Sequence, residues 1–182
     1  MKGYAFEDYN DAIDVLNDNM SLNTIEKYAK IVKMQRERRI QRVSEGNINK
    51  AINRWRIGTY SNEKAYENDL ASYLRSRFGN STIKQQSGRN KVDIEVINEQ
   101  NTKERYPIEL KFNFGLDARS RLDYQLGQYW REYKKRTFLV VCGINDFNAW
   151  SDFKHHTYPK YSSKVHLIVK KDKVISKHLS KK

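Results

Sequence analysis

Two segments near the middle of the chain alternate apolar with charged residues, and this alternation constrains the fold more than any other feature. In 92–96 (VDIEV) and 106–112 (YPIELKF), every second residue is apolar, and Asp93, Glu109 and Lys111 fall between them. A period of two residues is typical of a strand with one face in the core. The polar stretch that separates the segments is short enough for a hairpin. We therefore expect two antiparallel neighbouring strands.

The periodicity on either side of these strands predicts the other elements. Apolar residues recur at helical spacing from Ser61 or Asn62 to just before Gly79, and again from about 118 to 135. Further strands are predicted at 82–86, at the near-continuous apolar run 137–142, and at the sheet edge over 165–169. The order αβββαβ predicts an α/β fold, with a mixed sheet flanked by helices.

The N-terminal third predicts a separate basic region. We expect a helix from about 22 to 44, ended near Gly46, and a short one from 47 to 56. Residues 1–57 are thus predicted to be a basic helical extension, and 58–182 a core with a Lys-rich tail. The basic residues of the first helix, Arg36 and Arg39 among them, suit a solvated surface or a phosphate-contacting arm equally. Trp55 suits packing on the core better than stacking on a base.

The net charge of +13 suggests a polyanionic partner, with DNA first and an anionic membrane second. No apolar run approaches the roughly 20 residues of a membrane span, and no signal peptide precedes the core, so we expect a cytoplasmic protein with no membrane partner. The single cysteine, Cys142, excludes an internal disulfide and a cysteine-held metal cluster within one chain. No Walker or Rossmann pattern occurs, so no nucleotide cofactor is expected.

The charged residues of the two alternating segments predict a cation site. A hairpin places Asp93 near Glu109, and two facing carboxylates repel unless a cation lies between them. Mg²⁺ prefers such oxygen ligands and completes its shell with water and phosphate. Glu67 adds a third carboxylate beside the apolar stripe of its helix, where Glu63, one turn earlier, is an alternative.

These motifs, in this order, resemble the PD-(D/E)XK nuclease superfamily. The segments VDIEV and YPIELKF are similar to its D…ExK motif, the upstream EKAYENDLASYL to its first helix, and QLGQY to the Q-x₃-Y element of its RecB-like branch. The resemblance covers about residues 61–142 and implies a restriction-endonuclease-like core. Two features depart from the pattern. Val92 stands where the family has proline, and Glu95 offers a second acid on the face of Asp93.

The resemblance also implies a role for each matching residue. Asp93, Glu109, Glu67 and the Leu110 carbonyl would hold Mg²⁺ or Mn²⁺, and Lys111 would orient or activate the attacking water. Gln125 and Tyr129 would lie at the rim of the site, near the strand end or the phosphate, and Tyr129 would then contact nucleic acid. From position and charge, the other residues expected to contact nucleic acid are Arg89, Arg119, Arg121, Lys154, Arg36 and Arg39.

The implied activity is metal-dependent hydrolysis of DNA phosphodiester bonds. A small basic chain without an ATPase motor suits an endonuclease that acts on branched DNA, like the archaeal-type Holliday-junction resolvases, and a homodimer is then expected. The Q-x₃-Y element favours single strands or ends instead, as in RecB-like nucleases. The alternative is a non-catalytic DNA-binding protein that keeps the nuclease fold.

Overall fold

A computed structural model describes residues 26–27, 29–31 and 40–170. The chain divides into two compact units, 1–40 and 41–182. In the first unit, the described residues 26–27 and 29–31 are helical and exposed. Arg36, Arg39 and the Lys-rich segment 171–182 lie outside the described residues.

The second unit is built on a five-stranded mixed sheet in the order β1-β2-β3-β4-β5. Strands β1, β2 and β3 pair antiparallel, whereas β3, β4 and β5 pair parallel. This arrangement confirms the predicted antiparallel pair, the mixed sheet and the edge position of the last strand. The strands are β1 (Ile83–Ser87), β2 (Val92–Ile97), β3 (Arg105–Phe114), β4 (Thr137–Ile144) and β5 (Val165–Lys170).

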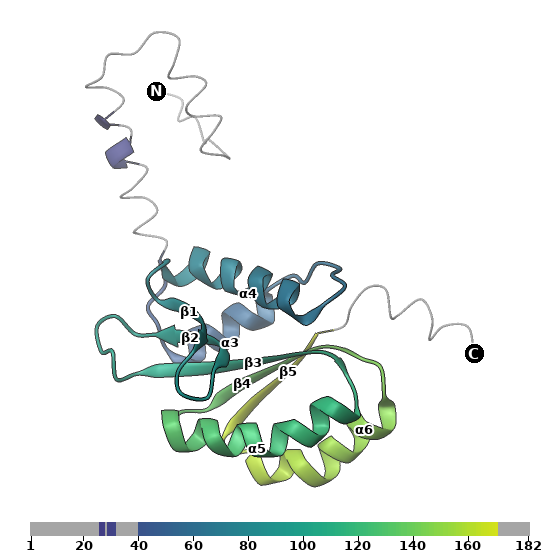
Figure 1. Ribbon diagram of the computed structural model, residues 1–182. Helices are drawn as coiled ribbons and strands as arrows, with labels where there is room; N and C mark the ends of the chain where they lie inside the picture. The colour runs from purple at the N-terminus through teal and green to yellow at the C-terminus, as the bar shows by residue number, and fades with distance from the viewer. Residues whose placement is uncertain (1–25, 28, 32–39, 171–182) are drawn as a thin grey trace. The chain divides into compact units, whose positions relative to one another are not determined.

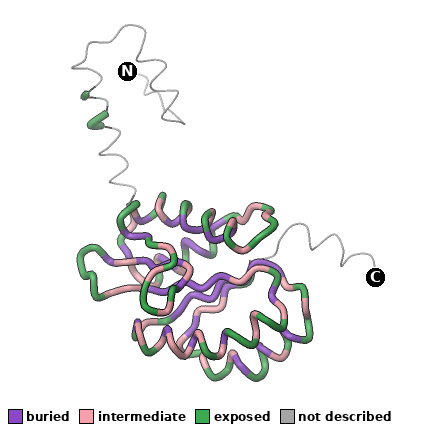
Figure 2. The backbone as a smooth tube through the Cα atoms, in the orientation of Figure 1, coloured by how far each residue is buried: buried purple, intermediate pink, exposed green. Residues whose placement is uncertain are grey.

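Helices cover both faces of the sheet, with α3 and α4 on one side and α5 and α6 on the other (Figure 1). Each side has its own apolar core, because alternate residues of the strands point to opposite faces. Strand β4 is buried along nearly its whole length, as its continuous apolar run predicted (Figure 2). The helices are α3 (Glu45–Arg54), α4 (Glu63–Phe78), α5 (Leu116–Tyr133) and α6 (Phe147–Asp152).

Local signals set the limits of α4, the helix that carries the acidic residues of the site. The side chain of Asn62 accepts a hydrogen bond from the Ala65 N–H at 2.9 Å and so caps the first turn. Gly79 ends the helix with φ of +99°, a conformation that other residues adopt at a cost. The predicted limits of this helix are therefore confirmed.

The α3 segment packs against the sheet. Ile48, Ile52 and Trp55 lie in the core that α4 and the sheet share. Trp55 is 3% exposed and its indole N–H donates to Asp69 at 3.1 Å, which confirms that this residue packs on the core. The compact unit thus begins at Gln41, ahead of the expected division between residues 57 and 58.

The predicted end of the N-terminal helix was wrong. Residues 40–44 are not helical, and Gly46 lies in the first turn of α3 instead of ending a helix, because Ser44 caps that turn by accepting from the Asn47 N–H at 3.3 Å. After α6 the chain forms a π-helical turn (Phe153–Thr157) and a 3₁₀ turn (Tyr158–Tyr161). Buried Phe153 anchors them by packing on Phe114 and Trp150.

Among the helices of the described segments, none combines the length and the apolar character that a membrane crossing requires. Their outer surfaces are largely exposed and polar, while the buried residues face the sheet (Figure 2). The charged residues buried along the sheet are therefore the feature of this fold that requires an explanation.

Candidate active site

The candidate site lies where β2 separates from β3. The paired residues end at Ile94 and Ile108, although β3 continues to Phe114. Beyond this point, side-chain carboxylates take the backbone N–H groups that a neighbouring strand would otherwise bind. Asp93 Oδ2 accepts from the Leu110 N–H at 2.8 Å, and Glu63 Oε2 accepts from the Phe112 N–H at 2.9 Å. The strand separation thus brings two acids to one edge of β3.

The ionised form of the Asp93 carboxyl group is disfavoured at this position. Burial is the main cause that raises its pKa, followed by the negative charge of Glu109. The positive charge of Lys111 and the Leu110 N–H act in the opposite direction, and the resulting pKa is about 7. A carboxyl group that resists ionisation beside another acid is a common feature of catalytic and metal sites.

Glu109 is the most enclosed acid of the site, with 1% of its surface exposed. The Tyr129 hydroxyl donates to its Oε2 at 2.7 Å, and Lys111 Nζ lies 2.5 Å from its Oε1. A buried carboxylate needs such partners, because an uncompensated charge in the core is costly. Tyr129 projects from α5, so this helix and β3 together set the orientation of Glu109.

Lys111 interacts with all the acids on the β3 side of the site. Its Nζ also lies 3.7 Å from Glu63 Oε1. Burial lowers its pKa, but Glu109, Glu63 and Asp93 raise it by more, and the net pKa is raised. The ammonium group therefore stays protonated, as a fixed positive charge 12% exposed at the edge of the acid cluster.

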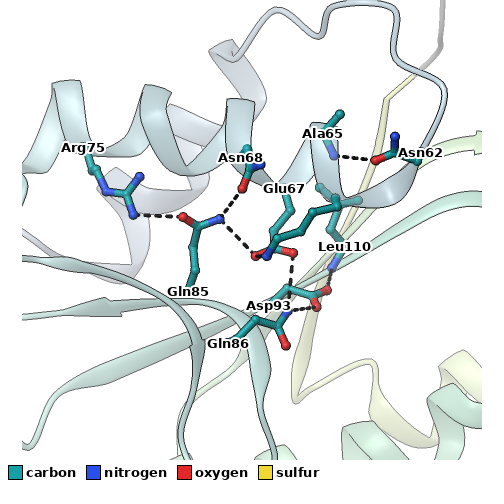
Figure 3. A network of polar contacts seen from close by, with 10 residues as sticks. Asn62, Ala65, Glu67, Asn68, Arg75, Gln85, Gln86, Asp93 and Leu110 are labelled. Atoms are coloured by element: carbon teal, nitrogen blue, oxygen red, sulfur yellow. Dashed lines mark hydrogen bonds and ion pairs between the residues drawn. The ribbon is translucent and has the colours of Figure 1, made fainter.

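Glu67 joins the cluster from α4, on the other side of Asp93 (Figure 3). Lys64 and Gln85 donate to its Oε1 at 2.7 and 3.0 Å. The Gln86 carboxamide reaches both Glu67 Oε2, at 3.4 Å, and Asp93 Oδ1, at 3.2 Å (Figure 3). This amide bridges two carboxylates that would otherwise repel. The structure thus brings together the four residues Glu67, Asp93, Glu109 and Lys111.

Two hollows open beside the cluster. The first, of about 430 Å³, is lined by Lys111 and Glu63 together with the start of α5. The second, of about 470 Å³, lies along α5 and includes Gln125 and Tyr129. Arg121 lines both and is exposed, so one guanidinium is shared by the two hollows.

The other residues predicted to contact nucleic acid or to line the site differ in their exposure and in their partners. Tyr129 is buried against Glu109, so its hydroxyl supports the acid and is not presented at the surface. Arg119 forms an ion pair with Asp152. Arg89 is exposed on the β1–β2 turn, and Lys154 is exposed over the rings of Trp150 and Tyr158. Gln125 lines the second hollow.

Two glutamines that contact the acids of the site were not predicted from the sequence. Gln85 and Gln86 were treated only as part of a strand, although both donate to Glu67. The sequence pattern that could have indicated them is the pair of adjacent glutamines near the end of a short strand, a few residues before Asp93. The alternative acid, Glu95, has partners of its own: its carboxylate pairs with Arg105 at 3.1 Å and accepts from Ser87 at 2.7 Å.

The chemistry of the donors fits a hard divalent cation. Carboxylate and carbonyl oxygens are the ligands of Mg²⁺ and Mn²⁺, and a cation would favour the ionised form of Asp93, whose pKa is raised by burial and then by the charge of Glu109. In an extended strand the N–H and C=O of one residue point to the same side, so the Leu110 carbonyl faces the side of Asp93. Within the described part of the chain, no three Asp, Glu, His or Cys side chains stand ready at metal-ligand spacing.

Comparisons of the chain with protein-family models, with curated proteins and with solved structures found no match. Its class is therefore stated from the fold and the site alone. The chain is an α/β protein with a five-stranded mixed sheet flanked by helices. It carries a cluster of carboxylates and a largely enclosed lysine, Lys111, at the separation of two strands.

Proposed function

We propose that this chain is a divalent-metal-dependent nuclease of the PD-(D/E)XK superfamily that hydrolyses DNA phosphodiester bonds. One observation carries the proposal: Asp93 and Glu109 meet beside Lys111 where β2 leaves β3, and the pKa of Asp93 is raised to about 7. Three charged groups on adjacent core strands are costly for folding, and a function explains their presence.

Each residue of the cluster has a distinct part in the proposed reaction. Asp93, Glu109 and the Leu110 carbonyl would hold Mg²⁺ or Mn²⁺, with Glu67 reaching it directly or through a bound water. When bound, the cation lowers the pKa of water and neutralises charge at phosphorus. Lys111, which stays protonated, stabilises the negative charge that develops on the phosphate oxygens. Tyr129 keeps Glu109 in place through its hydrogen bond.

The charges around the cluster suit a DNA backbone. Arg121 is exposed and lines both hollows, while Arg89 and Lys154 are exposed elsewhere on the same unit. Contacts of this kind bind phosphates irrespective of sequence and weaken as salt rises. We propose an endonuclease that acts on branched or single-stranded DNA, resembling junction resolvases or RecB-like nucleases, as a monomer or as a homodimer.

One observation favours the alternative function, a DNA-binding protein that keeps the fold and does not cut. Both oxygens of Glu109 and both oxygens of Glu67 already have protein partners, so the cluster is satisfied without a metal. A protein that keeps the fold but only binds DNA would show this arrangement. The two readings differ in whether DNA is cut when Mg²⁺ is present.

The test is cleavage of labelled single-stranded, duplex, flap and four-way-junction DNA in Mg²⁺, Mn²⁺ or EDTA. The variants are Asp93→Asn, which keeps the shape of the side chain and its acceptor for the Leu110 N–H, and Glu99→Gln as an exposed acid outside the cluster. We expect metal-dependent cutting by the wild type and by Glu99→Gln, and at least a hundredfold loss in Asp93→Asn. Binding without cutting in either metal would support the DNA-binding protein instead.

A further inference from the structure

The second hollow has features of a binding site in its own right. Its volume is about 470 Å³, and it lies between α5 and the β1–β2 turn. It adjoins the acid cluster directly, because Tyr129 lines it and also donates to Glu109 at 2.7 Å. Its other lining residues are Asn90, Ser120, Arg121, Tyr124, Gln125 and Gln128.

The hollow holds hydrogen-bonding groups that no described residue satisfies. Gln125 Oε1 is buried without a hydrogen-bond partner in this part of the structure. The Gln128 carboxamide and the Tyr124 hydroxyl likewise make no hydrogen bond to any described residue. Tyr124 is 71% exposed, so one face of its ring is accessible to a ligand that enters the hollow. These groups point to a flat, polar-edged ligand.

Hydrogen bonds hold the β1–β2 turn, which forms the side of the hollow opposite α5, in place. Glu132 accepts from the Arg89 N–H at 3.0 Å and from Asn90 Nδ2 at 2.6 Å, which fixes the β1–β2 turn against α5. Gly88 allows this close approach, since its φ is +76° and a Cβ there would collide with the Tyr133 hydroxyl. Asn90 is therefore positioned before any ligand binds, and its Oδ1 remains available as an acceptor.

We propose that this hollow binds one unpaired nucleobase of the DNA next to the phosphate at the acid cluster. The Tyr124 ring provides a stacking surface, and the Gln125 and Gln128 carboxamides offer both donors and acceptors to the edge of a base. A base inside a duplex has its edge paired and its faces covered, so it cannot enter. This inference rests on the proposed function and narrows its substrates to DNA with unpaired nucleotides, at a strand end, a flap or a junction.

The test measures base binding without cleavage. The full chain in EDTA is titrated into a single strand that contains 2-aminopurine, and into the same strand in a duplex, while the fluorescence of that base is followed. We expect tighter binding and stronger quenching with the single strand. Loss of the stacking surface in Tyr124→Ala should weaken single-strand binding roughly tenfold, whereas Tyr124→Phe keeps the ring and the affinity. Phe147→Ala, which removes an exposed ring outside the hollow, is the matched control.

The outcomes separate this inference from the nuclease proposal. Equal binding of duplex and single strand, or full affinity and quenching in Tyr124→Ala, would overturn the base-binding hollow even if the protein cuts DNA. Ring-dependent binding of the single strand by a protein that cuts no DNA in Mg²⁺ or Mn²⁺ would support the hollow and refute the nuclease. Circular dichroism of each variant confirms that the exposed substitutions leave the fold intact.

Discussion

The carboxylate of Asp93 accepts the backbone N–H of Leu110 at 2.8 Å, in the place that a neighbouring strand would occupy. This one hydrogen bond joins the end of the β2–β3 pairing to the acid cluster. It directs Asp93 toward β3, where Glu109 and Lys111 alternate along the strand. The position of the site is therefore a consequence of where the two strands separate, and the predictions below depend on that geometry.

The raised pKa of Asp93 predicts a pH-dependent stability. The folded protein favours the neutral carboxyl with a pKa of about 7, whereas an unfolded chain ionises it near 3.8. The unfolding free energy should therefore fall as the pH rises from about 4 through 7, by up to roughly 4 kcal/mol. Urea unfolding in EDTA at pH 5 and pH 8 measures the part of this change above pH 5, roughly 3 kcal/mol. Asp93→Asn should lose less stability over the same interval, and parallel losses in both proteins would contradict the assignment.

A divalent cation should reverse that trend. The cation binds the ionised form, so added Mg²⁺ or Mn²⁺ should raise the melting temperature more at pH 8 than at pH 5. Ca²⁺ serves as a second hard cation, and Asp93→Asn as the variant with a weakened site. A shift of equal size at both pH values, or in both proteins, would show that the cations act elsewhere.

Lys111 and Lys64 both pair with buried glutamates, but their removal should lower the unfolding free energy by very different amounts. Lys111 is 12% exposed and balances Glu109, so Lys111→Met leaves a buried charge alone and should cost about 3–5 kcal/mol of unfolding free energy. Lys64 is 56% exposed in its pair with Glu67, so Lys64→Met should cost less than about 1 kcal/mol. Urea unfolding compares the two. Cleavage should disappear only in Lys111→Met, and similar losses of stability would mean that Glu109 is better solvated than the structure indicates.

Tyr129→Phe should remove the hydrogen bond to Glu109 while the ring keeps its apolar contacts. The variant loses the hydroxyl that donates to Glu109 Oε2, which leaves a buried acceptor unsatisfied and should cost about 1–3 kcal/mol. Without this donor Glu109 is less firmly oriented, so half-maximal cleavage should need a higher Mg²⁺ concentration. Tyr158→Phe, whose hydroxyl has no hydrogen-bond partner among the described residues, is the control. An identical Mg²⁺ dependence of cleavage in all three proteins would exclude a role for this bond.

The packing of α3 predicts where the chain can be shortened. A chain that begins at Gln41 should fold with unchanged stability, since the compact unit begins there. A chain that begins at Gly58 exposes the apolar surface that α3 covers, and should not fold cooperatively. Trp55→Ala in the full chain should cost about 3–5 kcal/mol. Cooperative unfolding of the chain from Gly58 would instead support a separate domain at 1–57.

The sequence by itself determined the secondary structure of the sheet region and which residues share a face. The spacing of Glu109 and Lys111 places both on one side of a strand, and the stripe around Glu67 places that acid toward the core. Such patterns are local, because each depends on the period of its own element. The family resemblance and the activity remain predictions that only the experiments above can test.

Only the tertiary structure decided which partner each charged group has. The pattern offered Glu95 as a second acid beside Asp93, and in the structure Arg105 pairs with Glu95 whereas the Leu110 N–H donates to Asp93. Tyr129 bonds to Glu109 across 20 positions of the sequence, and Phe112 to Glu63 across 49. These pairings depend on how α4, α5 and the sheet pack together, since hydrogen bonds and charge interactions act through space over a few ångströms, irrespective of the separation along the chain.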